Sequence, residues 1–297
     1  MIYLDWFTFP DEEVEFDFFM RQKRTCYDSF YPFQILSRHH FRRIDFAPVT
    51  ILYGGNGTGK TTAINVIAEK LGLDRDSAFN RSNFFWDYLE RCDFEARVPL
   101  PGESRIITSD DVFDYMLNIR SMNEGIDRKK ESLFEEYLDA KYSHFQMRSL
   151  DDYEKLKKVN KARSKTQSRF VRSELMDTIR EYSKRRKCVF CIFRKRLQSR
   201  HYFCWMSRKT VCLLSDSRSW CVFIEDSVRF YGCQFVISTH SPFVLSMKGA
   251  KIYDLDEDPV DVKHWTELEN IKAYYKFFKK HEHEFHFDNE GGRRWNT

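Results

Sequence analysis

The chain contains 297 residues, of which 42% are hydrophobic and 32% are charged. That length can bury a sizeable core, and 28 Phe with 15 Tyr residues are too many for a disordered chain. No apolar run approaches the roughly 18 residues that a transmembrane helix requires. The first 20 residues are acidic, which excludes a signal or transit peptide. We therefore expect a cytoplasmic globular protein with no membrane partner, whose eight Cys residues are free thiols.

The formal net charge of +4 comes from one segment, residues 184–222. This basic segment holds eleven Lys or Arg residues against one acid, Asp216, and also contains five of the eight Cys and two of the six Trp. The rest of the chain carries 38 basic and 44 acidic side chains. Any affinity for nucleic acid that the net charge suggests would therefore belong to this segment alone.

The first third of the chain reads as strands, turns and one helix. Residues 1–48 are rich in Phe and Tyr, and we expect short strands and turns there. A β-branched and aromatic run at 49–53 predicts a buried strand, which a glycine-rich stretch follows at once. Apolar residues at helical spacing then predict a helix that reaches Leu71 and ends at Gly72.

Farther along, a strand is expected at 105–108, passing into a helix near Val112. Residues 127–183 are dense in Lys, Glu, Arg and Leu and contain neither Gly nor Pro, a composition typical of long helices. We expect a helical excursion at about 112–182 from a single domain spanning 1–297. After the basic segment, we expect a helix at 223–231, strands at 234–239 and 251–255, and a polar, frayed tail from Lys279.

Gly54 to Thr61 match the pattern G-x-x-x-x-G-K-[ST] between the predicted strand and the predicted helix. In this motif, glycines let backbone N–H groups form a cup around a phosphate, and the helix adds its positive dipole end. Lys60 would reach the β- and γ-phosphates, and the Thr61 hydroxyl would bind Mg²⁺. The sequence therefore predicts that nine residues bind a nucleoside triphosphate: Gly54, Gly55, Asn56, Gly57, Thr58, Gly59, Lys60, Thr61 and Thr62.

A second motif, Ile237-Ser238-Thr239-His240-Ser241-Pro242, begins in the strand expected at 234–239. Together with the glycine loop, it resembles ABC-type ATPases of the RecF/SMC/OLD-like group, particularly small bacterial AAA-family ATPases. The resemblance covers roughly residues 1–183 and 223–285. It implies an α/β P-loop NTPase sheet flanked by helices, with ATP and Mg²⁺ as ligands and a homodimer around two ATP molecules. It also implies that His240 is the catalytic switch histidine at the γ-phosphate.

Two motifs of this family are missing between the helical excursion and His240. One is the Ser-Gly-Glu-like signature, and the other is Walker B, in which an Asp binds Mg²⁺ and a following Glu activates water. In Phe223-Ile224-Glu225-Asp226 the apolar run is short and the acids are reversed, so we interpret both acids as solvated helix residues. The adenine contacts and the glutamine-loop equivalent, which could lie near Ser109-Asp110, stay open.

The codons of the basic segment can spell both missing motifs in other reading frames. Codons for Lys184 to Phe190 can be written so that a frame one base later reads Asn-Gly-Glu-Ser-Ala-Phe. Codons for Cys204 to Asp216 can be written so that a frame one base earlier reads Leu-Leu-Asp-Glu-Pro-Glu-Asn-Ser-Leu-Ser-Pro-Glu-Arg. Our hypothesis is that residues 184–222 are a frameshifted translation of an ordinary ATPase core, which would replace a core strand.

Two other interpretations give the basic segment a function of its own. Cys188 and Cys191, with three further Cys, could form a zinc site, although no second C-x-x-C or H-x₃₋₅-H pair follows. Its cationic and aromatic side chains could instead bind single-stranded nucleic acid, in a non-hydrolysing, nucleotide-dependent interaction module. On the leading interpretation, the chain binds ATP but hydrolyses it slowly or not at all, because the general base is absent. We expect Lys184 to Lys187 to be exposed, because burying four cations is very costly.

Overall fold

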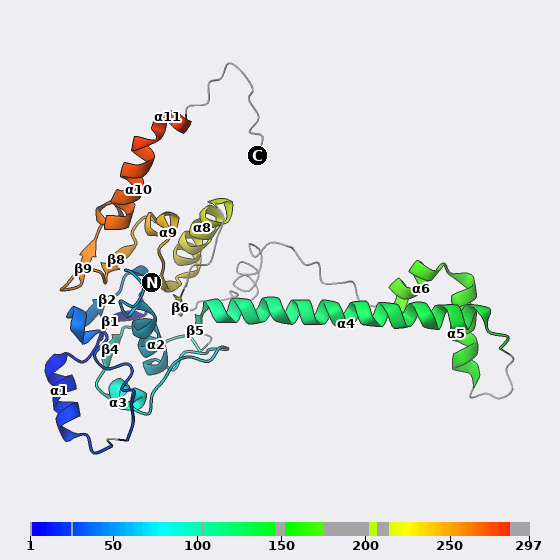
Figure 1. The fold of residues 1–297 in the computed structure, drawn as a ribbon, viewed down its shortest axis with the longest axis horizontal. Helices are drawn as coiled ribbons and strands as arrows, with labels where there is room; N and C mark the ends of the chain where they lie inside the picture. Colours follow the sequence, from blue (N-terminus) through cyan, green and yellow to red (C-terminus); the bar gives the residue numbers. More distant parts are fainter. Residues whose placement is uncertain are drawn as a thin grey trace. The chain divides into compact units, whose positions relative to one another are not determined.

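The computed structural model describes residues 2–24, 26–102, 104–145, 152–174, 202–206 and 214–285. The chain divides into two compact units, one formed by Met1–Asp111 with Phe193–Thr297 and the other by Val112–Ile192. The first unit combines sheets with helices, and the regular structure in the described part of the second is helical (Figure 1). Across these described residues, no helix is both long and apolar enough to cross a bilayer.

The larger sheet of the first unit has six strands in its described part, in the order β5-β6-β7-β3-β8-β9. Neighbouring strands run parallel, except that β9 is antiparallel to β8. Every residue of β3 and of β7 is buried, as expected for parallel strands covered on both faces. The strands span Arg105–Ile107 (β5), Tyr202–Met206 (β6), Gln234–Ser238 (β7), Val49–Tyr53 (β3), Lys251–Asp254 (β8) and Asp261–Lys263 (β9).

Helices cover this sheet and form its connections, so the chain is an α/β protein. The helix that follows β3, α2, packs against β6 and β7 and against α3. In the first unit, the helices are α1 (Glu12–Arg21), α2 (Lys60–Lys70), α3 (Phe85–Glu90), α8 (Leu214–Tyr231), α9 (Pro242–Leu245), α10 (Glu269–Lys280) and α11 (Glu282–Phe285), with 3₁₀ turns η1 (Ser37–His39) and η3 (Trp265–Glu267).

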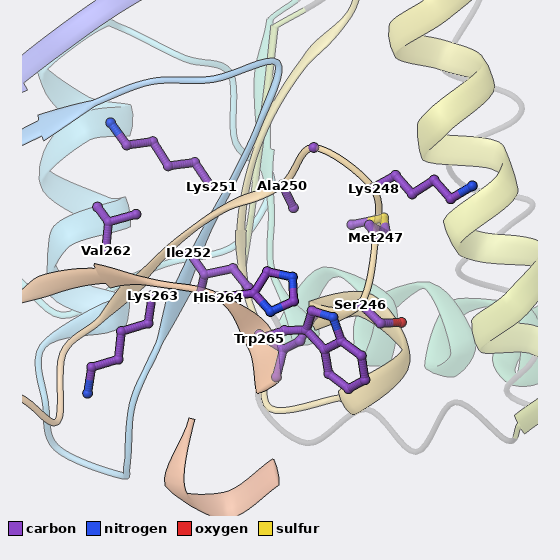
Figure 2. Close-up of a pocket in the computed structure, with 12 residues that line it drawn as sticks. Ser246, Met247, Lys248, Ala250, Lys251, Ile252, Val262, Lys263, His264 and Trp265 are labelled. Carbon is purple, nitrogen blue, oxygen red and sulfur yellow. The ribbon is translucent and has the colours of Figure 1, made fainter. Parts of the chain in front are cut away.

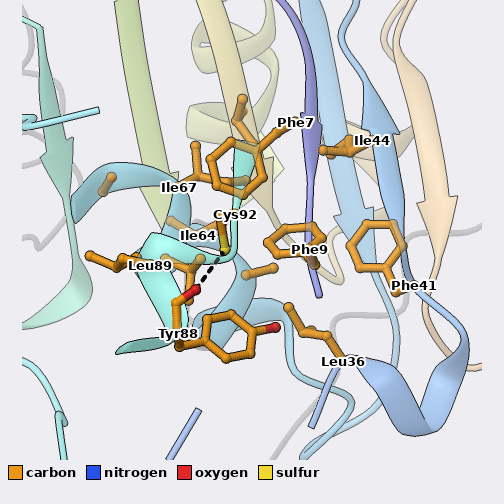
Figure 3. Close-up of a cluster of buried hydrophobic side chains, with 14 of the residues drawn as sticks. Phe7, Phe9, Leu36, Phe41, Ile44, Ile64, Ile67, Tyr88, Leu89 and Cys92 are labelled. Carbon is orange, nitrogen blue, oxygen red and sulfur yellow. Dashed lines mark hydrogen bonds between the residues drawn. The ribbon is translucent and has the colours of Figure 1, made fainter. Parts of the chain in front are cut away.

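A smaller antiparallel sheet has the order β2-β1-β4, with bounds Arg43–Asp45, Leu4–Thr8 and Asp93–Ala96. It shares one hydrophobic core with α2 and α3, and Figure 3 shows part of this cluster. Aromatic rings fill much of it: Phe18 stacks on Phe33 with ring centroids 4.4 Å apart, and Phe30 stacks on Phe84 at 4.7 Å. The Phe-rich N-terminal residues thus form a large part of the core.

Gln234, at the start of β7, ties the two sheets together. Its Oε1 accepts hydrogen bonds from the backbone N–H groups of Tyr3 (2.8 Å) and Leu4 (2.9 Å). Its Nε2 donates to the carbonyl oxygens of Leu4 (2.9 Å) and Ala47 (3.3 Å). The side chain is fully buried, so this amide satisfies backbone groups that water does not reach.

The expectation of strands and turns alone over residues 1–48 is wrong, because Glu12–Arg21 forms helix α1. Asp11 caps the helix by accepting a hydrogen bond from the N–H of Val14 at 3.0 Å. Acids in the first turn and Arg21 in the last complement the helix dipole. The frayed tail expected from Lys279 is also wrong in part, since α10 runs to Lys280 and α11 to Phe285.

The second unit is built from helices in the range expected for the excursion. Most of α4 (Ser109–Tyr142) lies in it, together with α5 (Tyr153–Ser164) and α6 (Gln167–Glu174). A small core of its own holds these helices together: Leu133, Tyr137, Ala162, Phe170 and Val171. Tyr137 also donates a hydrogen bond from its hydroxyl to the carbonyl oxygen of Lys165 at 3.2 Å.

The described part of the basic segment includes a strand, β6, between β5 and β7. The segment therefore supplies a strand of its own at this position of the sheet. The physical reason is local, because Tyr202–Met206 is an aromatic and apolar run that suits a central strand. Lys184 to Lys187, with Cys188 and Cys191, lie outside the described residues, so their predicted exposure and the zinc interpretation stay predictions.

Candidate functional site

The glycine loop joins the carboxyl end of β3 to the first residue of α2, Lys60. Gly59 caps α2 in the left-handed region at φ 87°. A Cβ added there would lie 2.7 Å from Leu36 Cδ2 and 3.0 Å from Ile35 Cγ2. Only glycine fits this turn without strain. The first N–H groups of α2, which have no partner within the helix, therefore begin directly at the loop.

Lys60 is a buried cation, with 8% of its surface exposed. Its Nζ donates to the carbonyl oxygen of Gly54 at 2.6 Å and to that of Gly55, and lies 3.3 Å from Thr58 Oγ1. Burial lowers the pKa of Lys60, and the nearby carboxylate of Asp256 opposes that shift. The loop thus holds one positive charge, for which the described residues offer the carboxylate of Asp256 nearby.

Two carboxylates at the end of β8, the neighbour of β3, lie beside the loop: Asp254 is its last residue, and Asp256 follows it. Asp256 Oδ1 accepts a hydrogen bond from the backbone N–H of Gly55 at 2.5 Å. Asp254 is buried, its Oδ2 lies 3.3 Å from Lys263 Nζ, and burial raises its pKa despite this pairing. Asp256 therefore fixes the loop conformation, whereas Asp254 is engaged in an internal ion pair.

A cavity of about 640 Å³ opens at the carboxyl ends of β3 and β7. It brings together most of the residues predicted to bind nucleotide: Asn56, Gly57, Gly59, Lys60, Thr61, Thr62 and His240. Gly54, Gly55 and Thr58 do not line it, and Thr58 Oγ1 instead donates to the carbonyl oxygen of Gly55 at 3.1 Å. Some loop residues thus line the cavity, whereas Gly54, Gly55 and Thr58 belong to the part of the loop that does not.

His240 reaches this cavity because β7 lies beside β3, with Ser238 in register with Leu52. The imidazole lies edge-on to Tyr53, with ring centroids 6.0 Å apart. The turn around it is fixed by Thr239 Oγ1, which accepts a hydrogen bond from the N–H of Ser241 at 3.0 Å. Two motifs about 180 residues apart in the chain are therefore neighbours in space.

The start of α4 forms another part of the cavity wall, through Thr108 and Asp110. Asp111 Oδ2 accepts hydrogen bonds from the N–H and the hydroxyl of Thr108, at 2.5 and 3.0 Å. Thr108 Oγ1 also lies 2.8 Å from Ser77 Oγ. Among the described residues that line the cavity, Asp110 supplies the one carboxylate, and the glutamine-loop role left open for Ser109-Asp110 stays a prediction.

Another part of the wall comes from residues outside the motifs found in the sequence: Ile35, Asn65, Arg75, Ala78, Phe79 and Asn80. The Arg75 guanidinium lies 3.8 Å from the Phe79 ring centroid and pairs with Glu69 at 2.9 Å. Its second Nη donates to Asn65 Oδ1 at 3.2 Å. This wall offers flat aromatic and guanidinium surfaces, on which a nucleobase could stack.

Glu225 and Asp226 lie on α8 and are exposed, which confirms that they are solvated helix residues. Met206, the last residue of β6, is in register with Ser238, so this strand also ends at the cavity edge of the sheet. Residues 207–213 lie outside the described residues, and the first acid after Met206 in the sequence is Asp216. No group of three or more His, Cys, Asp and Glu side chains in the described part of the chain could hold a metal ion by itself.

A second cavity of about 620 Å³ lies between the loop before β8 and the turn after β9 (Figure 2). Lys248, Lys251, Lys263, His264 and Trp265 are among its lining residues. In Figure 2 the three lysine side chains point in different directions, and Lys263 pairs with Asp254 and Glu257. This cavity contains none of the residues predicted to bind nucleotide.

No protein-family model and no curated protein matches the chain. Among solved structures, it is similar to a metal-chelate type ABC transporter in an inward-facing conformation, with 13% identity and a TM-score of 0.37 over 79% of this chain and 82% of that one. It is also similar to Stu0660 of Streptococcus thermophilus, with 12% identity and a TM-score of 0.39 over 84% of this chain and 78% of that one. Both TM-scores are below 0.5, so neither similarity defines the fold.

Proposed function

We propose that the protein binds ATP with Mg²⁺ in the cavity at the carboxyl ends of β3 and β7, as an ABC-type nucleotide-binding protein. One observation carries the proposal: Lys60, Thr61 and His240 line the same cavity, although the sequence assigned them from separate motifs. Ligands of parallel α/β sheets bind at this edge, where loops and helix N-termini converge. A volume of about 640 Å³ is in the range of cavities that hold small ligands.

The phosphates would lie over the loop and the N-terminus of α2. Backbone N–H groups at the first turn of α2 and the positive end of its dipole favour an anion there. Lys60 adds a full charge, which the loop carbonyls already hold in place. Burying a charge is costly unless it has a partner of opposite charge. A triphosphate would supply that anionic partner to the buried ammonium group of Lys60.

Mg²⁺ would be held by the nucleotide, by the Thr61 hydroxyl and by the Asp110 carboxylate. These two side chains fit a hard cation because both offer oxygen and both line the same cavity. When bound, the ion would neutralise charge on the β- and γ-phosphates. His240 would contact the γ-phosphate from the end of β7, as the resemblance to ABC-type ATPases implies.

ATP hydrolysis should be slow or absent. Asp110 is the one carboxylate among the described cavity residues, and no acid follows β6 before Asp216. A positioned general base contributes about 10²–10⁴-fold to such reactions. The protein should therefore bind ATP with a turnover far below about 1 s⁻¹, the lower end of the range for kinases.

Titration with a fluorescent ATP analogue in the presence of Mg²⁺ tests the proposal. Lys60→Ala should weaken binding by about 10- to 100-fold, because it removes a charged donor to phosphate. Lys248→Ala removes an exposed lysine outside the cavity and should bind as the unaltered protein does. Equal affinities for all three proteins would rule the proposed site out.

A further inference from the structure

Helix α10 exposes a row of aromatic side chains. Ile271 anchors it in the core, together with Leu268 just before its first residue. After Ile271, every residue up to Lys280 is exposed. The aromatic side chains of α10 and α11 have more than half of their surface exposed: Tyr274 (52%), Tyr275 (65%), Phe277 (56%), Phe278 (53%) and Phe285 (56%). In Figure 1 the helix extends away from the sheet beyond β9.

The lysines of α10 border its aromatic face. Ile271, Tyr274, Tyr275 and Phe278 follow the i, i+3, i+4, i+7 spacing of one helical face. Lys272, Lys276, Lys279 and Lys280 follow their own helical spacing, and Lys272 and Lys279 flank Tyr275 along the helix. Within α10 the one acid is Glu269, in the first turn. The helix is therefore strongly amphipathic, basic and aromatic.

An exposed aromatic face bordered by lysines favours one kind of partner. Single strands of nucleic acid are usually held in a positively charged groove that contains aromatic side chains, whereas α10 is one helix with every residue from Lys272 to Lys280 exposed. A second copy of α10 packed antiparallel would place its lysine edge against the same edge of the first, which is repulsive. An anionic bilayer accepts the apolar face among its headgroups and attracts the lysines at the edge.

We propose that α10 binds the surface of an anionic lipid bilayer, lying in the interface with its aromatic face inward. Tyr and Phe rings suit that depth, and lysine stems can extend toward the headgroups. The helix is anchored to the first unit through Ile271 and η3, so binding would bring the nucleotide site to a membrane surface without a spanning segment. The proposal does not depend on nucleotide binding.

Co-sedimentation of the full chain with vesicles tests this proposal. The protein should bind vesicles of phosphatidylcholine with 30% phosphatidylserine and should bind phosphatidylcholine alone much more weakly. The double variant Tyr275→Ser/Phe278→Ser should bind the anionic vesicles about tenfold more weakly or worse, because apolar burial is lost. Lys272→Glu/Lys279→Glu should lose about 20-fold or more, and should lose the dependence on phosphatidylserine.

Helix α1 offers a matched control, because it exposes Phe16 and Met20 on an acidic helix. Phe16→Ser/Met20→Ser removes a similar exposed apolar surface and should leave vesicle binding unchanged. Thermal unfolding of each variant should match that of the unaltered chain, which separates lost binding from lost folding. Two results would overturn the proposal: equal binding to both kinds of vesicle, or a dimer in light scattering that Tyr275→Ser/Phe278→Ser dissociates.

Discussion

At the scale of single residues, the central feature of the site is Lys60, a charged side chain that is buried. Its ammonium group is held by the loop carbonyls, while burial lowers its pKa below the ordinary value of lysine. Such a group loses its proton at a lower pH than an exposed lysine does, and only the protonated form attracts phosphate. The dependence of ATP affinity on pH in the alkaline range should therefore be set by the protonation of Lys60.

The affinity for ATP should fall as pH rises through the lowered pKa of Lys60 and should be constant below it. In Lys60→Arg, the guanidinium stays charged over the same range, so the alkaline fall should disappear even if the affinity at neutral pH is lower. Equilibrium titrations from pH 7 to pH 10 with both proteins measure this difference. A parallel fall in both would assign the effect to another group.

Asp110 should couple Mg²⁺ to nucleotide binding. Asp110→Asn should reduce the gain in ATP affinity that Mg²⁺ provides by about tenfold, because a carboxylate ligand is lost and the amide carries no charge. Asp114→Asn alters an exposed acid one turn farther along the same helix and should leave that gain intact. Fluorescence titrations with Mg²⁺ and with EDTA give the gain for each variant. An unaltered gain in Asp110→Asn would remove Asp110 from the metal site.

At the residue scale, the sequence could group side chains only where they belong to one continuous motif. Lys60 and Thr61 are three residues or fewer from loop glycines, so sequence alone places them together. Arg75 and Phe79 belong to no such motif and meet the loop only through the packing of the core. In the sequence, Asp110 is only an acid near the start of a predicted helix. The structure distinguishes it, because it is the one carboxylate among the described residues that line the cavity.

At the scale of elements, local pattern explains what was predicted and what was not. The strand at 49–53 and helix α2 were predicted because a buried β-branched run, a glycine loop and helical apolar spacing adjoin one another. Helix α1 was missed because its Phe residues suggested strands, whereas the Asp11 cap and the acidic first turn decide for helix. Strand β6 was not predicted, because its short aromatic run lies between stretches rich in Lys and Arg.

Gln234 should be the most sensitive link between the two sheets. Gln234→Leu leaves buried backbone groups of Tyr3 and Leu4 without their partner and should destabilise the first unit by about 3 kcal/mol. Unfolding followed by circular dichroism should show a midpoint lower by roughly 6–12 °C. Gln22→Leu alters a glutamine whose side chain, in the described hydrogen bonds, bonds only to nearby Arg24, and it should shift the midpoint little. Equal midpoints for the two variants would contradict this role.

At the scale of the whole molecule, the strand order places three strand ends at one edge. β3, β7 and β6 are successive neighbours, so the glycine loop, His240 and the end of β6 meet there. The sequence predicted the α/β class, but the strand order depends on pairings between distant segments and could not be read from any one of them. If the reading-frame hypothesis is correct, the shifted Asp-Glu pair would lie at the end of β6, because its codons overlap those of residues 205–207.

Resequencing the coding DNA between codons 175 and 230 tests that hypothesis. Three extra or missing bases should be found, restoring an Asp-Glu pair at the end of β6 beside Ser238. The corrected protein should then hydrolyse ATP, because a general base would adjoin the nucleotide cavity. An unchanged DNA sequence would contradict the hypothesis and leave nucleotide binding without turnover as the account of this chain.

A crystal structure of the protein with Mg²⁺ and a non-hydrolysable ATP analogue tests the central claim most directly. We predict that the β- and γ-phosphates lie within hydrogen-bonding distance of Lys60 Nζ and of the N–H groups at the start of α2. We also predict Mg²⁺ at the Thr61 hydroxyl and the His240 imidazole beside the γ-phosphate. An analogue bound elsewhere, or a glycine loop that contacts no phosphate at saturating concentration, would contradict the account.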